Sequence, residues 1–292
     1  MTQRIKTKTW QKIGLRMLIT ILVLIVLFPL LIMVTTAFKS DAEVSKGIMH
    51  IFPETWMFSN FKTAMQQGNW LTYFKNSAII TGVAVPCSLI INSMSGYAFG
   101  RLKFKGNKIM FYFAMVGMML PMQVIMIPVF LQIKQFPLVG GNDMFGLGGV
   151  GLINNLWGVI LPLVAHPFGM FMCRNYYLGF PKELDEAAKI DGCSKWKVYV
   201  HLYLPIGKPI LATLCLLKTV DTWNQYTWPL LVFNTSENYT VQLVLNNFKS
   251  ESFTQWNYLM AATMLIVLPI LVMFVFLQKY FVQGIATTGL KD

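Results

Sequence analysis

The chain has 292 residues, of which 55% are hydrophobic and only 12% charged, with a mean hydropathy of +0.54. This balance lies outside the range of soluble globular domains and predicts an integral membrane protein. The formal net charge of +12 does not indicate nucleic-acid binding. Membrane proteins carry an excess of lysine and arginine in the loops on the cytoplasmic side, and this positive-inside bias explains the charge more simply. The four cysteines form no C-x-x-C pair, so we expect neither disulfides nor a metal site.

Six segments are apolar enough to cross the hydrocarbon layer, which takes about 20 residues of helix. They lie at about residues 14–37, 76–99, 109–131, 156–178, 209–233 and 258–280. The sequence therefore predicts an all-α integral membrane protein with six transmembrane helices and both termini on one side. We divide it into a basic N-terminus at 1–13, a six-span membrane domain at 14–281 and a C-terminal tail at 282–292.

The distribution of basic residues predicts which side the termini occupy. Seventeen lysines and arginines fall at the two chain ends and in the segments 101–108 and 174–208, against six in the alternate segments. Those six are Lys39, Lys46, Lys62, Lys75, Lys134 and Lys249. Loops rich in lysine and arginine stay in the cytoplasm, so we expect cytoplasmic termini and a cytoplasmic 174–208 segment.

A charged stretch from 183 to 209 separates two of the apolar segments. Leu184, Ala187 and Ala188 recur at helical spacing, and carboxylates in the first turn favour the positive end of a helix. Gly192 suits the C-terminal cap of this helix. We expect a short helix whose small-residue face lets another surface come close.

A second short helix is predicted directly after the first. Ser194 suits its N-cap, and large side chains recur at helical spacing until Pro205 ends the helix. These side chains are Trp196, Tyr199, Val200, Tyr203 and Leu204. Residues 181–209 are therefore predicted to form a docking element of two helices set at an angle.

Polar residues intrude most into the fifth apolar segment. On one continuous helix, at about 100° per residue, five of them share about a third of the circumference. They are Lys218, Asp221, Asn224, Gln225 and Trp228, whereas Trp223 lies nearly opposite and is expected to pack against a neighbouring span. Hydrogen-bonding groups beside an aromatic ring suit a sugar, so we predict that the stripe lines a substrate pathway.

Two alternatives remain open for this stripe. Charges inside a span are costly and are candidates for function, but Lys218 and Asp221 are neighbours on one helix face and can satisfy each other. The stripe can also pack against a partner subunit without touching substrate.

The chain contains no G-x-x-x-x-G-K-[ST] motif, the loop that cradles nucleotide phosphates. We therefore predict no catalytic residue and no cofactor in this chain, and expect any ATP hydrolysis to belong to another polypeptide.

The charged stretch resembles the EAA loop of the membrane subunits of ABC importers. The matching residues are Glu186-Ala187-Ala188, Asp191-Gly192 and Leu204-Pro205. The resemblance implies a type I importer permease fold, in which this loop forms the coupling helix that sits in a cleft of the cytoplasmic ATPase. ATP and Mg²⁺ are then bound by that partner.

The resemblance extends along most of the chain and points to carbohydrate importers, specifically to the smaller, maltose-permease-like subunit. The residues that carry it are Phe38-Lys39, Asn60-Phe61, Asn76-Ser77, Tyr97-Ala98-Phe99, Arg101, Gly106, Pro121, Pro128, Trp223-Asn224, Trp228-Pro229 and the tail 284–291. In this family such a tail can reach the ATPase dimer interface. This chain departs from the family's usual tail at Thr288, where glycine is common.

The resemblance implies a permease subunit in a bacterial inner or plasma membrane, importing a sugar or oligosaccharide. Its implied partners are a second homologous permease, an ATPase dimer, an extracellular solute-binding protein and membrane lipid, with no nucleic acid. A secondary transporter or channel should show internal repeats or paired charges that bind a coupling ion. That class, a scaffold without transport, and a permease for another solute such as glycerol-phosphate are the alternatives.

Overall fold

The computed structural model describes residues 9–47, 50–249 and 254–288, which form helices joined by loops, with one isolated bridge between Lys249 and Thr254. The chain divides into two compact units, residues 1–69 with 245–267 (unit 1) and residues 70–244 with 268–292 (unit 2). Unit 1 contains α1 (Thr9–Ala37), α2 (Asp41–Ser45), α3 (Ser59–Gln66), η3 (Leu245–Phe248) and the start of α15 (Trp256–Thr288).

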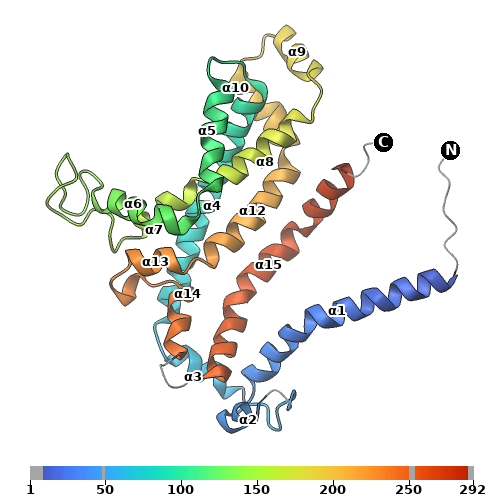
Figure 1. Cartoon of the computed structure of the whole chain (residues 1–292), viewed down its shortest axis with the longest axis vertical. Coiled ribbons are helices and arrows are strands. Elements are labelled where there is room, and N and C mark those ends of the chain that lie inside the picture. The colour runs from blue at the N-terminus through green and yellow to red at the C-terminus, as the bar shows by residue number, and fades with distance from the viewer. Residues whose placement is uncertain (1–8, 48–49, 250–253, 289–292) are drawn as a thin grey trace. The chain divides into compact units, whose positions relative to one another are not determined.

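Unit 2 is the larger and contains the sequence elements of greatest interest. Its helices are α4 (Trp70–Arg101), α5 (Asn107–Met119), α6 (Met122–Lys134), α7 (Leu156–Val164), α8 (Pro167–Leu178), α9 (Glu183–Ile190), α10 (Lys195–Val198), the π-helical turn η1 (Tyr199–Tyr203), α11 (Leu204–Ile206), α12 (Lys208–Trp223), α13 (Thr227–Val232), η2 (Ser236–Asn238), α14 (Val241–Val244) and the rest of α15. In Figure 1, α9 and α10 lie together at one end of this unit, and α13 and α14 lie toward the other.

The structure confirms the all-helical class predicted from the sequence. Its described residues allow between four and six membrane spans. Within the described residues, four helical segments are long and apolar enough to cross a membrane: Ile13–Ala37, Trp70–Arg101, Leu156–Leu178 and Trp256–Gln278. Two further pairs pass the same test but are bent, α5 with α6 by 106° and Lys195–Ile206 with α12 by 73°. If each bent pair is one span, the total reaches the six that the sequence predicts.

The third predicted span, 109–131, is wrong as a single helix. Pro121 has no N–H to donate, and its ring disfavours the helical conformation of the residue before it. Leu120 accordingly has ψ 121° and Pro121 ψ 139°, two successive extended residues between α5 and α6. The proline therefore breaks the helix at this point.

The fifth predicted span, 209–233, is also interrupted. Helix α12 ends at Trp223, and α13 begins only at Thr227. The fourth predicted span has a break of its own, because Ala165 and His166 are not helical before Pro167, which opens α8. The second span begins at Trp70, earlier than predicted, so Asn76 and Ser77 lie inside α4. The tail residues 289–292 and N-terminal residues 1–8 lie outside the described part of the chain.

In unit 1, the segment after α1 folds back against the end of that helix. The amide nitrogen of Asn60 donates to the carbonyl oxygens of Ala37 at 3.0 Å and Lys39 at 2.8 Å. The ring of Phe38 lies 5.1 Å from that of Phe61. A helix end leaves carbonyls without partners, and Asn60 satisfies those of α1.

Helix α2 opens with reciprocal hydrogen bonds between Ser40 and Glu43. The Ser40 backbone N–H donates to the Glu43 carboxylate at 2.8 Å, and the Glu54 backbone N–H donates to the same group. These bonds to the charged form lower the pKa of Glu43 to about 2. The turn between α1 and α3 is therefore held by an ionised carboxylate across the physiological range.

Helix α4 is the scaffold of unit 2, since it packs against α7, α8 and α12. At Gly96 the contact with α8 is so close that a Cβ atom would lie 2.4 Å from that of Cys173. Near the Trp70 end, Asn76 donates to the carbonyls of Glu237 and Tyr239, and Ser77 accepts from the Val241 backbone. One continuous helix thus links the α9 end of the unit with the α14 end.

Candidate functional site

The first helix of the predicted docking element forms where the sequence places it. Helix α9 runs from Glu183 to Ile190, with three acidic residues in its first turn. Gly192 follows with φ +69°, and the Cys193 N–H reaches back to the Ala188 carbonyl at 2.9 Å. This is the left-handed Schellman cap, so the prediction of a glycine C-cap is confirmed.

The second helix also begins as predicted, but it does not end at Pro205. The Ser194 hydroxyl accepts from the Lys197 N–H at 3.2 Å, and helix continues to Ile206. Pro205 has no N–H, but it lies at the start of α11, directly after the wide π-helical turn η1, where a missing donor is tolerated. The break falls at Gly207 instead, after which α12 turns by 73°.

Helix α9 exposes its face to solvent in the single chain. None of its residues is buried. Glu186 and Ala187 are exposed, Ala188 is half-buried, and Ile190 is 87% exposed. Asp191 follows the helix and is exposed as well. An apolar side chain this bare beside small residues marks a surface that another protein can cover.

The base of the docking element is anchored by a cluster of tyrosines from three helices. The hydroxyl of Ser93, on α4, lies 2.7 Å from that of Tyr177 and accepts from Tyr199 at 3.1 Å. Tyr97 donates to the carbonyl of Lys195, and its ring lies 5.0 Å from that of Tyr203. The second helix of the element is therefore fixed to α4 and α8, while α9 projects.

The structure brings together four of the five residues of the predicted polar stripe. The buried ammonium of Lys218 lies 2.8 Å from the Asp221 carboxylate, whose own side chain is 47% exposed. Gln225 donates to the other oxygen of Asp221 at 3.2 Å. Exposed Asn224 accepts from Gln242 of α14 at 2.8 Å. The sequence does not indicate Gln242 as a neighbour, because it lies between the fifth and sixth predicted spans.

Trp228 does not belong to this surface, and the prediction that it extends the stripe is wrong. The helix ends at Trp223, so positions beyond it no longer follow the 100° spacing. Trp228 lies on α13 and is 1% exposed, packed in the core of unit 2 with its ring N–H directed at the Gly158 carbonyl at 3.3 Å. Trp223 packs against Phe74 of α4 with ring centres 6.4 Å apart, as predicted for that residue.

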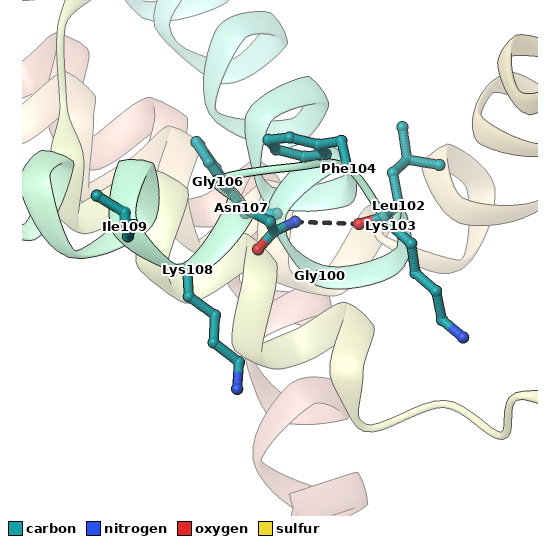
Figure 2. Close-up of a pocket in the computed structure, with 9 residues that line it drawn as sticks. Gly100, Leu102, Lys103, Phe104, Gly106, Asn107, Lys108 and Ile109 are labelled. Atoms are coloured by element: carbon teal, nitrogen blue, oxygen red, sulfur yellow. Dashed lines mark hydrogen bonds between the residues drawn. The ribbon is translucent and has the colours of Figure 1, made fainter.

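A basic recess of about 560 Å³ lies at the turn between α4 and α5. Its wall includes Lys103, Phe104 and Lys108, and the amide of Asn107 donates to the Leu102 carbonyl at 3.0 Å. Figure 2 shows the two lysine side chains extending away from this hydrogen bond. Among the described residues, no group of three or more histidine, cysteine or acidic side chains is placed to hold a metal.

Comparison with known families matches residues 88–287 to the binding-protein-dependent transport system inner membrane component. The chain belongs to this family. The match spans α8, the whole docking element and α12. As a member of the family, the chain is an inner membrane component of an ABC transport system, in agreement with its long apolar helices.

Relatives of this permease along nearly its whole length carry transport names. The arabinooligosaccharides transport system permease protein AraQ of Halalkalibacterium halodurans is 33% identical over 271 residues, covering 91% of this chain and 92% of that protein. The lactose transport system permease protein LacG of Rhizobium radiobacter is 28% identical, covering 88% and 89%.

A solved structure confirms the fold of this permease. The crystal structure of a bacterial ABC transporter involved in the import of the acidic polysaccharide alginate matches with a TM-score of 0.78, covering 96% of this chain and 100% of that one. The sequence identity is 22%, so this likeness speaks for the fold alone.

Proposed function

We propose that this chain is the permease subunit of an ATP-driven importer and forms half of the translocation pathway for a sugar or oligosaccharide. The names of its relatives, for arabinooligosaccharides and lactose among others, support a sugar as the cargo. The observation that carries the energy-coupling part is α9, an exposed helix presenting Glu186, Ala187 and bare Ile190 on an anchored base.

Two features of this chain support the proposed partners: its sequence has no G-x-x-x-x-G-K-[ST] motif, and its helix α9 is exposed. A cytoplasmic ATPase dimer, holding ATP and Mg²⁺, covers α9 with its neighbours Asp191, Gly192, Leu204 and Pro205. A second, homologous permease completes the pathway, and an extracellular binding protein delivers the sugar. One structure with the same fold, at a TM-score of 0.63, is an alginate ABC transporter in complex with its alginate pentasaccharide-bound periplasmic protein.

In this arrangement both termini and α9 lie in the cytoplasm, and the bent pairs each cross the membrane once. The asymmetry of lysine and arginine between alternate segments supports that orientation. The chain itself hydrolyses no ATP.

The polar surface formed by exposed Asp221 and Asn224 with half-buried Gln225 is our candidate for the substrate pathway. Lys218 supports it from beneath, because a buried ammonium paired with a half-exposed carboxylate fixes the direction of that carboxylate. Amide and carboxylate groups can bind sugar hydroxyls. Any aromatic platform beside them has to come from a residue other than Trp228.

The test is co-purification of the tagged full-length chain from its own bacterium, followed by uptake assays in a strain that lacks it. We expect an ATPase and a second permease to co-purify with the chain. The uptake panel contains oligosaccharides and glycerol-phosphate, and we expect the strain that lacks the chain to stop taking up one or more of the oligosaccharides. Ile190→Asp should lose the ATPase and keep the second permease, because it places a charge on the docking face. Leu147→Asp, an exposed apolar position in the 135–155 loop, is the matched control and should keep both.

Recovery of the chain without either partner would contradict the proposal and favour a secondary transporter or a scaffold. Loss of glycerol-phosphate uptake with normal sugar uptake would overturn the choice of cargo.

A further inference from the structure

Arg101 is the last residue of α4, and its side chain is 4% exposed although it carries a full charge. Taking a guanidinium out of water is costly unless it is paired and hydrogen-bonded. The groups that compensate this charge come from the C-terminal turn of α8 and from the segment between α8 and α12.

The guanidinium meets the ends of two helices. One terminal nitrogen, Nη1, donates to the carbonyl of Phe180 at 3.0 Å, and Nη2 donates to that of Pro181 at 2.8 Å. These carbonyls follow the C-terminus of α8, where a positive charge is favoured by the helix dipole. Nη2 also lies 2.5 Å from the Asp185 carboxylate in the first turn of α9.

Tyr203 closes the arrangement from the second helix of the docking element. Its hydroxyl donates to the other oxygen of Asp185 at 2.8 Å, and its ring lies beneath the guanidinium, 5.3 Å from the central carbon to the ring centre. Asp185 is therefore held by two donors from different elements, while the rest of α9 stays exposed. Arg101, Asp185 and Tyr203 form what we call the α9 clamp.

We propose that Arg101 is a positioning residue for energy coupling: through the α9 clamp it ties the coupling helix to α4. This rests on the proposed function of α9. Because α9 has no buried residue, few contacts other than the clamp tie it to the membrane helices. Helix α4 in turn packs against α12, which carries Lys218 and Asp221, so a displacement of α9 reaches the candidate pathway through α4.

The planar fork of arginine is required because two carbonyls and a carboxylate are served at once. Lysine keeps the charge but offers a single nitrogen, so Arg101→Lys should retain only part of the effect. Arg174 is the matched control. It lies on α8 near the same end of the unit, stacks on Phe111 of α5 at 4.1 Å and donates to the Phe99 carbonyl of α4, so its described contacts are with α4 and α5.

The first measurement uses the full-length chain in lipid nanodiscs and a glutamate-specific protease, which cleaves after Glu186 only when α9 opens. Cleavage follows the population of the opened segment when opening is fast. We expect Arg101→Gln to raise the cleavage rate at least about tenfold, and Arg174→Gln to leave it within about twofold. Asp185→Asn should raise the cleavage rate by a similar factor. The double variant with Arg101→Gln should be cleaved no faster than the faster of the two single variants, because both substitutions disrupt the same α9 clamp.

The second measurement is sugar uptake per ATP hydrolysed, in proteoliposomes of the complete transporter. We expect a several-fold fall for Arg101→Gln, a smaller fall for Arg101→Lys, and no change for Arg174→Gln. Unchanged cleavage after Glu186 in Arg101→Gln would overturn the clamp. Faster cleavage with normal uptake per ATP would overturn the coupling role. If the wild-type complex shows no ATP-linked uptake while the cleavage difference persists, the proposed function fails and the clamp remains.

Discussion

Gly192 is a residue at which the backbone conformation, and not the available space, limits substitution. At φ +69° it adopts the left-handed region, while a Cβ atom there would meet nothing within 4 Å. Any cost of substitution therefore comes from the backbone, not from crowding. Gly192→Val should destabilise the α9 cap by about 1–2 kcal/mol, whereas asparagine tolerates this region better.

The expected result is a complex that still assembles, with sugar uptake per ATP reduced by Gly192→Val and nearly preserved by Gly192→Asn. Proteoliposome assays of both variants side by side measure this ratio. Equal activity of the two would mean that the αL cap does not set the position of α9.

The sequence predicts the structural role of some residues of the site and not of others. Gly192 and Ser194 were predictable, because helix caps depend on a few neighbouring residues. Arg101 was noted only as part of a family resemblance, and its partners Phe180 and Asp185 lie about eighty positions away. No local pattern indicates such a contact, so its role becomes visible only when α4, α8 and α9 are seen together.

The sequence predicts which segments are apolar helices, but it does not predict where those helices break or bend. An apolar segment of 20 residues satisfies the length of a span whether it is straight or broken, because hydropathy measures composition alone. The extended pair Leu120 and Pro121 turns the chain by 106° inside one such segment. The break after Trp223 has no proline at the break itself, so the sequence predicts one continuous helix there and extends the polar stripe onto Trp228.

The corrected stripe predicts which positions of α12 and α13 meet water. In a full-length chain without its four native cysteines, single cysteines at Asn224 and Gln225 should react quickly with small water-soluble thiol reagents. A cysteine at Val232, which is fully buried on α13 and similar in size to cysteine, is the control and should react slowly. Sugar should slow labelling at Asn224 and Gln225, since a bound ligand covers the site.

Slow labelling at Asn224 and Gln225 in the assembled transporter, equal to that at Val232, would remove this surface from the pathway. It would instead indicate that a partner subunit covers the surface.

At the scale of the whole molecule, the path of the chain through the membrane depends on the two bent pairs. A bent pair that crosses the membrane carries the chain to the other side, whereas a re-entrant pair returns it to the side it left. With four candidate spans and two sharply bent pairs among the described residues, six crossings require both pairs to cross the membrane. The basic residues of 101–108 and 174–208 favour that arrangement, because they place the two loops on the same side as the termini.

Reporters inserted at positions flanking the bent pairs distinguish these paths. If α5 and α6 together form one span, a reporter at Gly106 should read cytoplasmic and one at Gly141 external. Ser194 should read cytoplasmic, because the ATPase must reach α9, and Thr55 external. The reason is electrostatic: moving the lysines of 101–108 and 174–208 out of the cytoplasm opposes the bias that orients membrane proteins. If Gly106 and Gly141 report the same side, α5 and α6 are a re-entrant loop, and an external reading at Ser194 would make docking of α9 onto a cytoplasmic ATPase impossible.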